Sequence, residues 1–230
     1  MPSVVVTGAN RGIGLALAKR YSAAGWQVHA SARDPQSAET LQAMPSVRVH
    51  PLDVSDQSSI DAFAGALAGV PVDHLINNAG VLGPRHIAFG ETDLALWTSV
   101  LTVNTAGPWL VTERLAANLE LGKARRVAVI SSQLGSIANA GSGWPPVYAA
   151  SKAGANMVVR QLALALRDKW AAKETIVLSL HPGWVRTAMG GEEAPESPEE
   201  SAAGIFTLMN QANAGMSGKF FTFEGEPLPW

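Results

Sequence analysis

The chain has 230 residues, of which 47% are hydrophobic and 16% charged, with a formal net charge of −2. This length and composition can bury one large core, so we expect a single domain over residues 1–230. The chain has no basic run and no long apolar stretch, which argues against nucleic acid or membrane partners. It has no cysteine, which excludes disulfides and thiolate chemistry. It shows no secretory leader pattern, so we expect a cytoplasmic protein.

Short apolar runs of β type alternate with helical patterns along the chain. The predicted strands are Val4–Thr7, Gln27–Ala32, Val47–Pro51, His74–Asn77, Arg126–Ser131, Ile176–His181 and Gly218–Thr222. The predicted helices are Ile13–Ala24, Ala38–Ala43, Ser58–Ala68, Thr92–Leu121, Val147–Trp170 and Pro198–Gln211. Several strands are apolar without alternation, as when both faces of a sheet are covered. The pattern predicts an α/β fold, a single Rossmann-type domain whose doubly wound, parallel, seven-stranded sheet has helices on both faces.

The first strand leads into a glycine-rich segment with Gly8, Gly12 and Gly14, which opens the first helix. Glycines here let the backbone turn sharply and approach a ligand. A helix N-terminus offers unpaired N–H groups and a positive dipole end to a phosphate. The spacing differs from the Gly-x-Gly-x-x-Gly dinucleotide fingerprint, and taken alone the segment is also compatible with a simple tight turn.

Tyr148 and Lys152 are four residues apart at the start of a long helical pattern, which puts both side chains on one helix face. An ammonium beside a phenol favours the phenolate, so we expect the tyrosine pKa to fall below about 10. Such a tyrosine could exchange a proton with a substrate oxygen. The alternative is a half-buried tyrosine near a solvated lysine. Ser131 and Ser132 end a predicted strand, where open α/β sheets bind ligands.

These segments together resemble the short-chain dehydrogenase/reductase family over nearly the whole chain. Six family motifs occur in order: Thr-Gly-x-x-x-Gly-x-Gly at 7–14, Asn-Asn-Ala-Gly at 77–80, an asparagine within 103–105, a serine within 130–132, Tyr-x-x-x-Lys at 148–152 and Pro-Gly-x-Val-x-Thr at 182–187. Within the family, the segments 181–191 and 198–201 and the ending 225–230 are similar to the C-factor and sniffer-like carbonyl reductases.

The resemblance implies the catalytic set Asn104, Ser132, Tyr148 and Lys152. Tyr148 would be the acid for carbonyl reduction or the base for alcohol oxidation. Lys152 would lower its pKa and bind the nicotinamide ribose, and Ser132 would hydrogen-bond the substrate oxygen. Asn104 would hold a water that links Lys152 to solvent. Ser131 competes with Ser132, because neighbouring strand residues point to opposite faces, and we favour Ser132 as the second of the pair.

The resemblance also implies a set of cofactor-binding residues. They are Gly8, Asn10, Arg11, Gly12, Ile13, Gly14, Arg33, Asp53, Val54, Asn78, Ala79, Gly80, Tyr148, Lys152, Pro182, Gly183, Val185 and Thr187. Within this set Asp53 would bind the adenine amino group, and Asn78 to Gly80 would lie along the cofactor. Asn77 would mainly brace the sheet.

The expected cofactor is NADP(H) rather than NAD(H). Ala32 stands where NAD-binding relatives carry an acidic residue, while Arg33 follows it and Arg11 lies in the glycine loop. Guanidinium groups suit the 2′-phosphate of NADP. Asp34, twenty residues after Gly14, is the competing NAD-type acid, and both arginines could instead be solvated, with Asp34 paired to one of them.

The activity implied is reduction of a ketone, aldehyde or quinone, or the reverse reaction. The alternative is an NADP-binding signalling or redox-sensor protein of the C-factor type with little turnover. Trp144 and Trp184 flank the expected nicotinamide site and suggest an apolar or aromatic substrate, and the six residues 141–146 lengthen the segment before Tyr148. The polar residues 190–200 suggest a surface loop or lid.

Two further expectations concern assembly and metals. In the family, the helical stretches that here are Thr92–Leu121 and Val147–Trp170 often pair across a two-fold axis, so we expect a homodimer or homotetramer. The five histidines lack metal-ligand spacing, so we expect no metal site.

Overall fold

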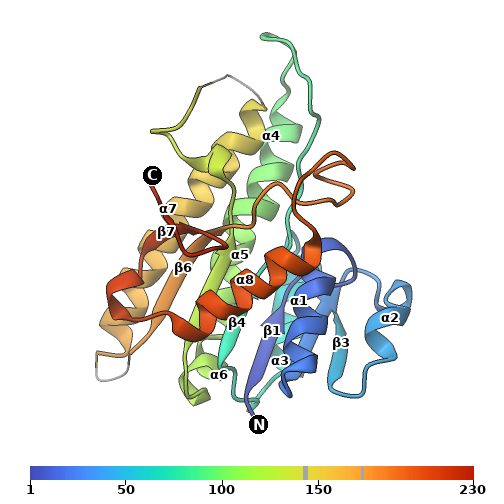
Figure 1. The fold of residues 1–230 in the computed structure, drawn as a ribbon, viewed down its shortest axis with the longest axis vertical. Coiled ribbons are helices and arrows are strands. Elements are labelled where there is room, and N and C mark those ends of the chain that lie inside the picture. Colours follow the sequence, from blue (N-terminus) through green and yellow to red (C-terminus); the bar gives the residue numbers. More distant parts are fainter. Residues whose placement is uncertain (142–144, 172–173) are drawn as a thin grey trace.

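The computed structural model describes residues 1–141, 145–171 and 174–230. One sheet has the strand order β3-β2-β1-β4-β5-β6-β7-β8 (Figure 1). The strands are β1 Ser3–Val6, β2 Gln27–Ala32, β3 Val47–Pro51, β4 His74–Asn77, β5 Arg126–Ile130, β6 Ile176–His181, β7 Lys219–Thr222 and β8 Pro227–Leu228. Neighbouring strands are parallel except β7 and β8. The doubly wound α/β fold is confirmed, but the prediction of seven strands missed β8, whose two residues are too few to show a β pattern.

Helices cover both faces of the sheet. They are α1 Gly12–Ala23, α2 Glu39–Gln42, α3 Gln57–Ala66, α4 Leu94–Leu101, α5 Gly107–Arg114, α6 Ala116–Leu121, α7 Pro146–Lys169 and α8 Pro198–Gln211. Figure 1 shows α1 and α8 side by side on one face. Val4 and Val6 belong to the core under these two helices, whereas Val5 belongs to the core under α3, α5 and α7. This alternation follows from the two-residue period of a strand.

The single helix predicted over Thr92–Leu121 is instead divided into α4, α5 and α6. Between α4 and α5 the chain makes a π-helical turn at Thr102–Ala106. Pro108 follows and has no backbone N–H, so the Asn104 carbonyl lacks the donor that a regular helix would supply four residues later. The prediction failed here because the apolar pattern continues across the break.

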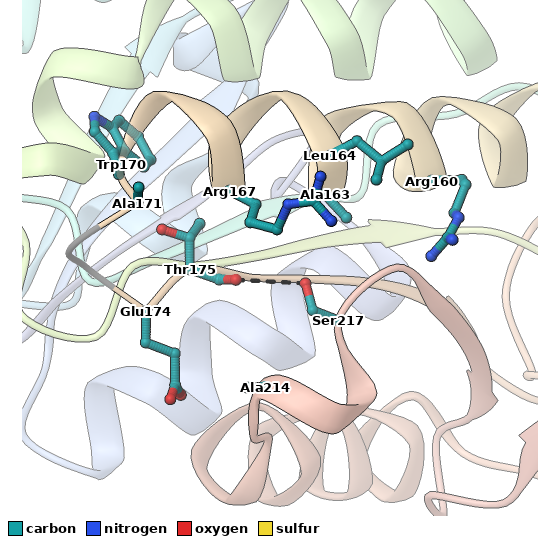
Figure 2. Close-up of a pocket in the computed structure, with 10 residues that line it drawn as sticks. All are labelled: Arg160, Ala163, Leu164, Arg167, Trp170, Ala171, Glu174, Thr175, Ala214 and Ser217. Carbon is teal, nitrogen blue, oxygen red and sulfur yellow. Dashed lines mark hydrogen bonds between the residues drawn. The ribbon is translucent and has the colours of Figure 1, made fainter.

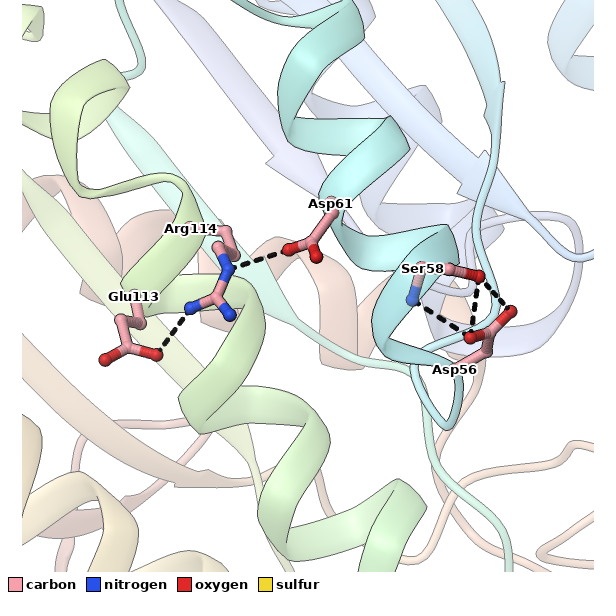
Figure 3. A network of polar contacts seen from close by, with 5 residues as sticks. All are labelled: Asp56, Ser58, Asp61, Glu113 and Arg114. Carbon is pink, nitrogen blue, oxygen red and sulfur yellow. Dashed lines mark hydrogen bonds and ion pairs between the residues drawn. The ribbon is translucent and has the colours of Figure 1, made fainter.

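Polar contacts fix the start and the outer face of α3. Asp56 caps the helix by accepting a hydrogen bond from the Ser58 N–H at 2.9 Å, and Arg114 of α5 reaches Asp61 of α3 at 2.7 Å (Figure 3). The cap satisfies a helix N–H and stabilises by roughly 1 kcal/mol. The ion pair is partly exposed and contributes only about 0–1 kcal/mol. Within the described ranges, none of the helices is long and apolar enough to cross a membrane.

Candidate active site

The carboxyl ends of β1, β4, β5 and β6 lie along one edge of the sheet, and the loops that leave them are joined. The Thr7 hydroxyl accepts hydrogen bonds from the N–H groups of Asn78 and Ala79, both at 3.0 Å. The Asn78 amide donates to the Gly8 carbonyl at 3.0 Å. These contacts fix the glycine loop against the segment after β4, where open α/β sheets bind ligands.

The glycine loop requires glycine at Gly8 and leads into a helix without a side-chain cap. Gly8 has φ +63°, and a Cβ there would lie 3.0 Å from the Ala79 Cα, so only glycine fits without strain. Among the residues that the structure describes, no side chain caps the N-terminus of α1, whose N-cap residue is Arg11. The first N–H groups of this helix are therefore available to an anion, as binding of a dinucleotide pyrophosphate requires.

The remaining predicted cofactor residues follow the carboxyl ends of five strands. They are Asn10, Gly12, Ile13 and Gly14 after β1, Arg33 after β2, Asp53 and Val54 after β3, Asn78, Ala79 and Gly80 after β4, and Pro182, Gly183, Val185 and Thr187 after β6. Thr187 lies against Gly12, since a Cβ on this glycine would meet its methyl group at 3.2 Å. The structure thus brings the first and the last of these segments together.

Arg33 and Asp34, at the end of β2, differ in whether their side chains have hydrogen-bond partners in the described part of the chain. The Asp34 carboxylate accepts a hydrogen bond from the Gln36 N–H at 2.9 Å and so caps a short 3₁₀ turn. Among the residues described, no ion pair joins Asp34 to Arg33 or Arg11. Arg33 is exposed, and its charge helps to lower the pKa of Asp53, after the larger effect of hydrogen bonds from Ser55.

Tyr148 and Lys152 project from α7 beside the end of β5. Both side chains are buried, with 8% and 5% of their surface exposed. Lys152 Nζ donates to the Ile130 carbonyl at 2.8 Å and lies 5.6 Å from the centre of the Tyr148 ring. The pair lies on one helix face, as the spacing predicted.

The predicted lowering of the tyrosine pKa is wrong. Burial raises the pKa of Tyr148 to about 12, and a hydrogen bond with the Ser132 side chain lowers it only in part. Burial also lowers the pKa of Lys152 to about 8. The sequence argument considered the charge of the lysine but not the desolvation of both groups, which disfavours phenolate and ammonium alike.

The two candidate serines are directed differently. The Ser132 side chain hydrogen-bonds Tyr148, and its Oγ also accepts from the Leu134 N–H at 3.2 Å. Ser131 Oγ donates to the Asn156 amide oxygen at 2.7 Å, within the interior. Ser132 is therefore the serine that faces the tyrosine.

Asn104 uses its side chain to brace the loop after β4. The amide donates to the Val81 carbonyl at 2.8 Å and to Ser151 Oγ at 2.9 Å, and the amide oxygen accepts from the Val81 N–H at 2.9 Å. A Cβ built on Gly80 would lie 3.3 Å from the Asn104 oxygen and 3.5 Å from Lys152 Nζ. Asn104 and Lys152 thus lie around the same glycine.

Three residues near the site were not singled out from the sequence: Thr7, Ser151 and Asn156. Asn156 falls at i+8 from Tyr148, on the helix face shared with Lys152, and this spacing could have revealed it. Thr7 lies inside the glycine motif, but its hydroxyl contacts belong to another loop and leave no local pattern.

Exposed apolar side chains lie on three segments that leave the same edge of the sheet. Trp184 is 53% exposed, Leu134 42% and Val81 37%, and they follow β6, β5 and β4. The indole N–H of Trp184 donates to the Gly190 carbonyl at 2.8 Å, which closes the segment 184–190 that leads into the loop at 190–200. Trp144, predicted to flank the site, lies outside the described residues.

A separate hollow of about 460 Å³ lies at the carboxyl end of α7, lined in part by Arg160, Arg167, Thr175 and Ser217 (Figure 2). Thr175 and Ser217 precede β6 and β7, so this hollow is at the opposite edge of the sheet from Tyr148. In the part of the chain that the structure describes, no group of three or more His, Cys, Asp or Glu side chains could hold a metal ion.

Known proteins are similar to this chain in sequence and in fold. A family model described as short chain dehydrogenase matches residues 2–198. C-signal of Myxococcus xanthus is 39% identical over 169 residues, which cover 74% of this chain and 99% of that protein. The crystal structure of NADPH-bound carbonyl reductase from chicken fatty liver has a TM-score of 0.90 and 31% identity, covering 100% and 99% of the two chains. Carbonyl reductase Sniffer of D. melanogaster has a TM-score of 0.88 and 25% identity, with full coverage of both. These similarities confirm the resemblance drawn from the motifs.

Proposed function

We propose that this chain, which belongs to the short-chain dehydrogenase family, is an NADPH-dependent oxidoreductase that reduces a carbonyl group to an alcohol. The observation that carries the proposal is the buried group of Ser132, Tyr148 and Lys152 at the ligand-binding edge of the sheet. The similarity to a carbonyl reductase with bound NADPH supports the choice of cofactor, and so does the exposed Arg33 at the end of β2.

NADPH supplies a hydride to the carbonyl carbon when it is bound. The glycine loop and the uncapped start of α1 would hold its pyrophosphate. Tyr148 would donate a proton to the carbonyl oxygen, and Ser132 would hydrogen-bond the same oxygen as negative charge develops there. The Lys152 ammonium, 5.6 Å from the centre of the Tyr148 ring, would favour the phenolate that forms when this proton leaves.

Replacement of that proton requires a path to solvent. The Asn104 side chain is already engaged by Val81 and Ser151. We therefore assign the water-holding role to the main-chain carbonyl of Asn104, which the missing N–H of Pro108 leaves without its usual helix donor.

The substrate is an apolar or aromatic carbonyl compound. The exposed side chains of Trp184, Leu134 and Val81 support this class, because they offer apolar surface around the catalytic group. The test is NADPH oxidation with a panel of ketones, aldehydes and quinones, run with wild type and with Tyr148→Phe. Turnover of the apolar members by wild type alone is the expected result, and no oxidation with any member would reject the activity.

The second candidate is an NADP-binding signalling or sensor protein, favoured by the 39% identity to C-signal. A pure sensor has no need of a proton donor, yet the catalytic set is complete in this chain. Binding of NADPH without turnover of any panel member would favour the sensor. The cytoplasmic location expected from composition stays a prediction.

A homo-oligomer is also part of the proposal. An apolar groove of about 650 Å³ runs between α4, α5 and α7, and Leu101, Trp109, Leu110 and Val158 line it with four smaller residues. These helices lie within the stretches expected to pair across a two-fold axis. A second copy of the chain would cover this apolar surface.

A further inference from the structure

Asn156 connects three separate segments of the site. Its side chain is 4% exposed, and its amide oxygen accepts hydrogen bonds from Ser131 Oγ at 2.7 Å and Ser179 Oγ at 2.6 Å. Its amide nitrogen donates to the Gly135 carbonyl at 3.1 Å. One side chain of α7 thus holds the end of β5, the middle of β6 and the 3₁₀ turn Gln133–Gly135.

The surrounding groups permit one orientation of this amide. If the amide were turned over, its oxygen would face the Gly135 carbonyl, and two acceptors would meet. In the observed orientation both serine hydroxyls and the carbonyl have partners. Buried polar groups that are satisfied in this way specify a single local structure.

Ser132 lies between two residues that Asn156 holds. Ser131 precedes it, and the Gly135 N–H donates to the Ser132 carbonyl at 2.8 Å. The turn also lies directly on α7, because a Cβ on Gly135 would come within 2.7 Å of the Lys152 carbonyl carbon. The position of Ser132 relative to α7 therefore depends on the hydrogen bonds of Asn156.

We propose that Asn156 is a positioning residue that holds segment 131–135 against α7, so that Ser132 meets Tyr148 and a substrate oxygen at the same time. The inference rests on the proposed function, which gives Ser132 and Tyr148 their roles. Without the amide, Ser131 and Gly135 lose their buried partners, and the segment shifts to regain hydrogen bonds. A shift of about 1 Å at a catalytic group can lower kcat on the order of 100-fold.

A titration of Tyr148 tests this without any substrate. The chain has only two tyrosines, and burial raises the pKa of Tyr21 far above its usual value, so Tyr148 is the first to give phenolate absorbance as pH rises. The spectra are recorded with and without NADP⁺, with Tyr148→Phe as the blank. The hydrogen bond with Ser132 lowers the pKa of Tyr148, so Asn156→Ala and Ser132→Ala should both move the titration to higher pH.

Asn118 provides the matched control. It is also 4% exposed, and its amide donates to the carbonyls of Leu67 and Val70, away from the site. Asn118→Ala should lower the melting temperature but leave the titration and kcat at wild-type values. Asn156→Ala should change all three while the Kd for NADPH stays within about threefold, since the hydrogen bonds of Asn156 go to Ser131, Gly135 and Ser179 and not to the glycine loop.

Ser131→Ala replaces Asn156→Ala if the latter does not fold, with Ser3→Ala, a buried serine at the start of β1, as its control. A titration and a kcat that match those of the control variant would overturn the proposal. If Tyr148→Phe instead turns over NADPH at the wild-type rate, the proposed function fails, while a shifted titration in Asn156→Ala would still support the positioning of Ser132.

Discussion

Lys152 Nζ lies 5.6 Å from the centre of the Tyr148 ring and donates its hydrogen bond to the Ile130 carbonyl instead. The two groups are neighbours on one face of α7, and the hydrogen bond that the lysine donates goes to the main chain. Burial therefore dominates the pKa of each group, which keeps Tyr148 protonated and ready to act as an acid.

Tyr148→Phe should abolish most turnover and leave cofactor binding nearly intact. Phenylalanine retains the ring and its packing but cannot donate a proton, so kcat should fall by about 10²–10⁴-fold, as is typical for an acid–base group. Steady-state kinetics and NADPH titration by fluorescence measure the two effects. A variant as fast as wild type would exclude Tyr148 as the acid.

The fold was largely predictable because most strands are buried on both faces and therefore stand out as continuous apolar runs. Strands β2, β3, β4 and β6 have the predicted bounds, as has α8. Ser132, Tyr148 and Lys152 lie together because β5 ends where α7 begins to pack against the sheet, and Lys152 donates to the last residue of β5. Local patterns could not reveal the π-helical turn around Asn104, across which the apolar pattern continues, nor the contacts of Asn156, whose partners are 21 to 25 residues away.

Lys152→Met should stabilise the protein at pH 7 by on the order of 1 kcal/mol, because it removes a charge that burial disfavours. Burial lowers the lysine pKa from 10.5 to about 8, so between these values the unfolded chain binds more protons and stability rises with pH. The advantage of the variant over wild type should therefore shrink from pH 8 to 10.5. Urea unfolding at pH 7, 8.5 and 10 gives the comparison, and a pH-independent difference would contradict it.

Acid should destabilise the fold through buried histidines. Burial lowers the pKa of His29 to about 4, of His74 to about 3 and of His181 to about 4, against 6.5 ordinarily. The neutral forms stabilise the fold fully above pH 6.5, and stability falls below it by ~1.4 kcal/mol per pH unit for each histidine. Urea unfolding between pH 7.5 and 5 gives the slope of the unfolding free energy against pH. His29→Leu should lower this slope below pH 6.5 by the contribution of one proton. An unchanged slope would show that His29 has the same pKa in the folded and the unfolded chain, and would contradict this expectation.

The mass of one chain is 24.1 kDa. Dimerisation through the groove between α4, α5 and α7 predicts a species of twice this mass at micromolar concentration. Leu101→Glu places a charge in the groove and should give monomers, because an unpaired charge is costly in an apolar interface. Sedimentation velocity distinguishes the two, with Leu94→Glu, an exposed leucine at the start of α4, as the control. Monomeric wild type would refute the dimer.

The last prediction is a preference for NADPH over NADH that depends on Arg33 and the side chain before it. Ala32 ends β2 and offers no carboxylate to a ribose 2′-hydroxyl, whereas Arg33 is exposed beside it. The glycine loop lies against the same strand end, because the Ala9 N–H donates to the Ser31 carbonyl at 2.8 Å, and this loop carries Arg11. Arginines on two adjoining segments suit a phosphate, which binds a guanidinium group through paired hydrogen bonds.

Asp34 is the alternative determinant, but its carboxylate already caps the turn at Gln36. Arg33→Ala should therefore raise KM for NADPH by about 10-fold or more and leave KM for NADH within about twofold, since charge-assisted hydrogen bonds contribute roughly 1.5–3 kcal/mol. Ala32→Asp combined with Arg33→Ala should reverse the preference, because the new carboxylate repels the 2′-phosphate and accepts from the 2′-hydroxyl. The measurement is kcat/KM with each cofactor, and Arg48→Ala, which removes an exposed arginine in the middle of β3, is the charge control. A wild type that works better with NADH would reject the role of both arginines and direct attention to Asp34.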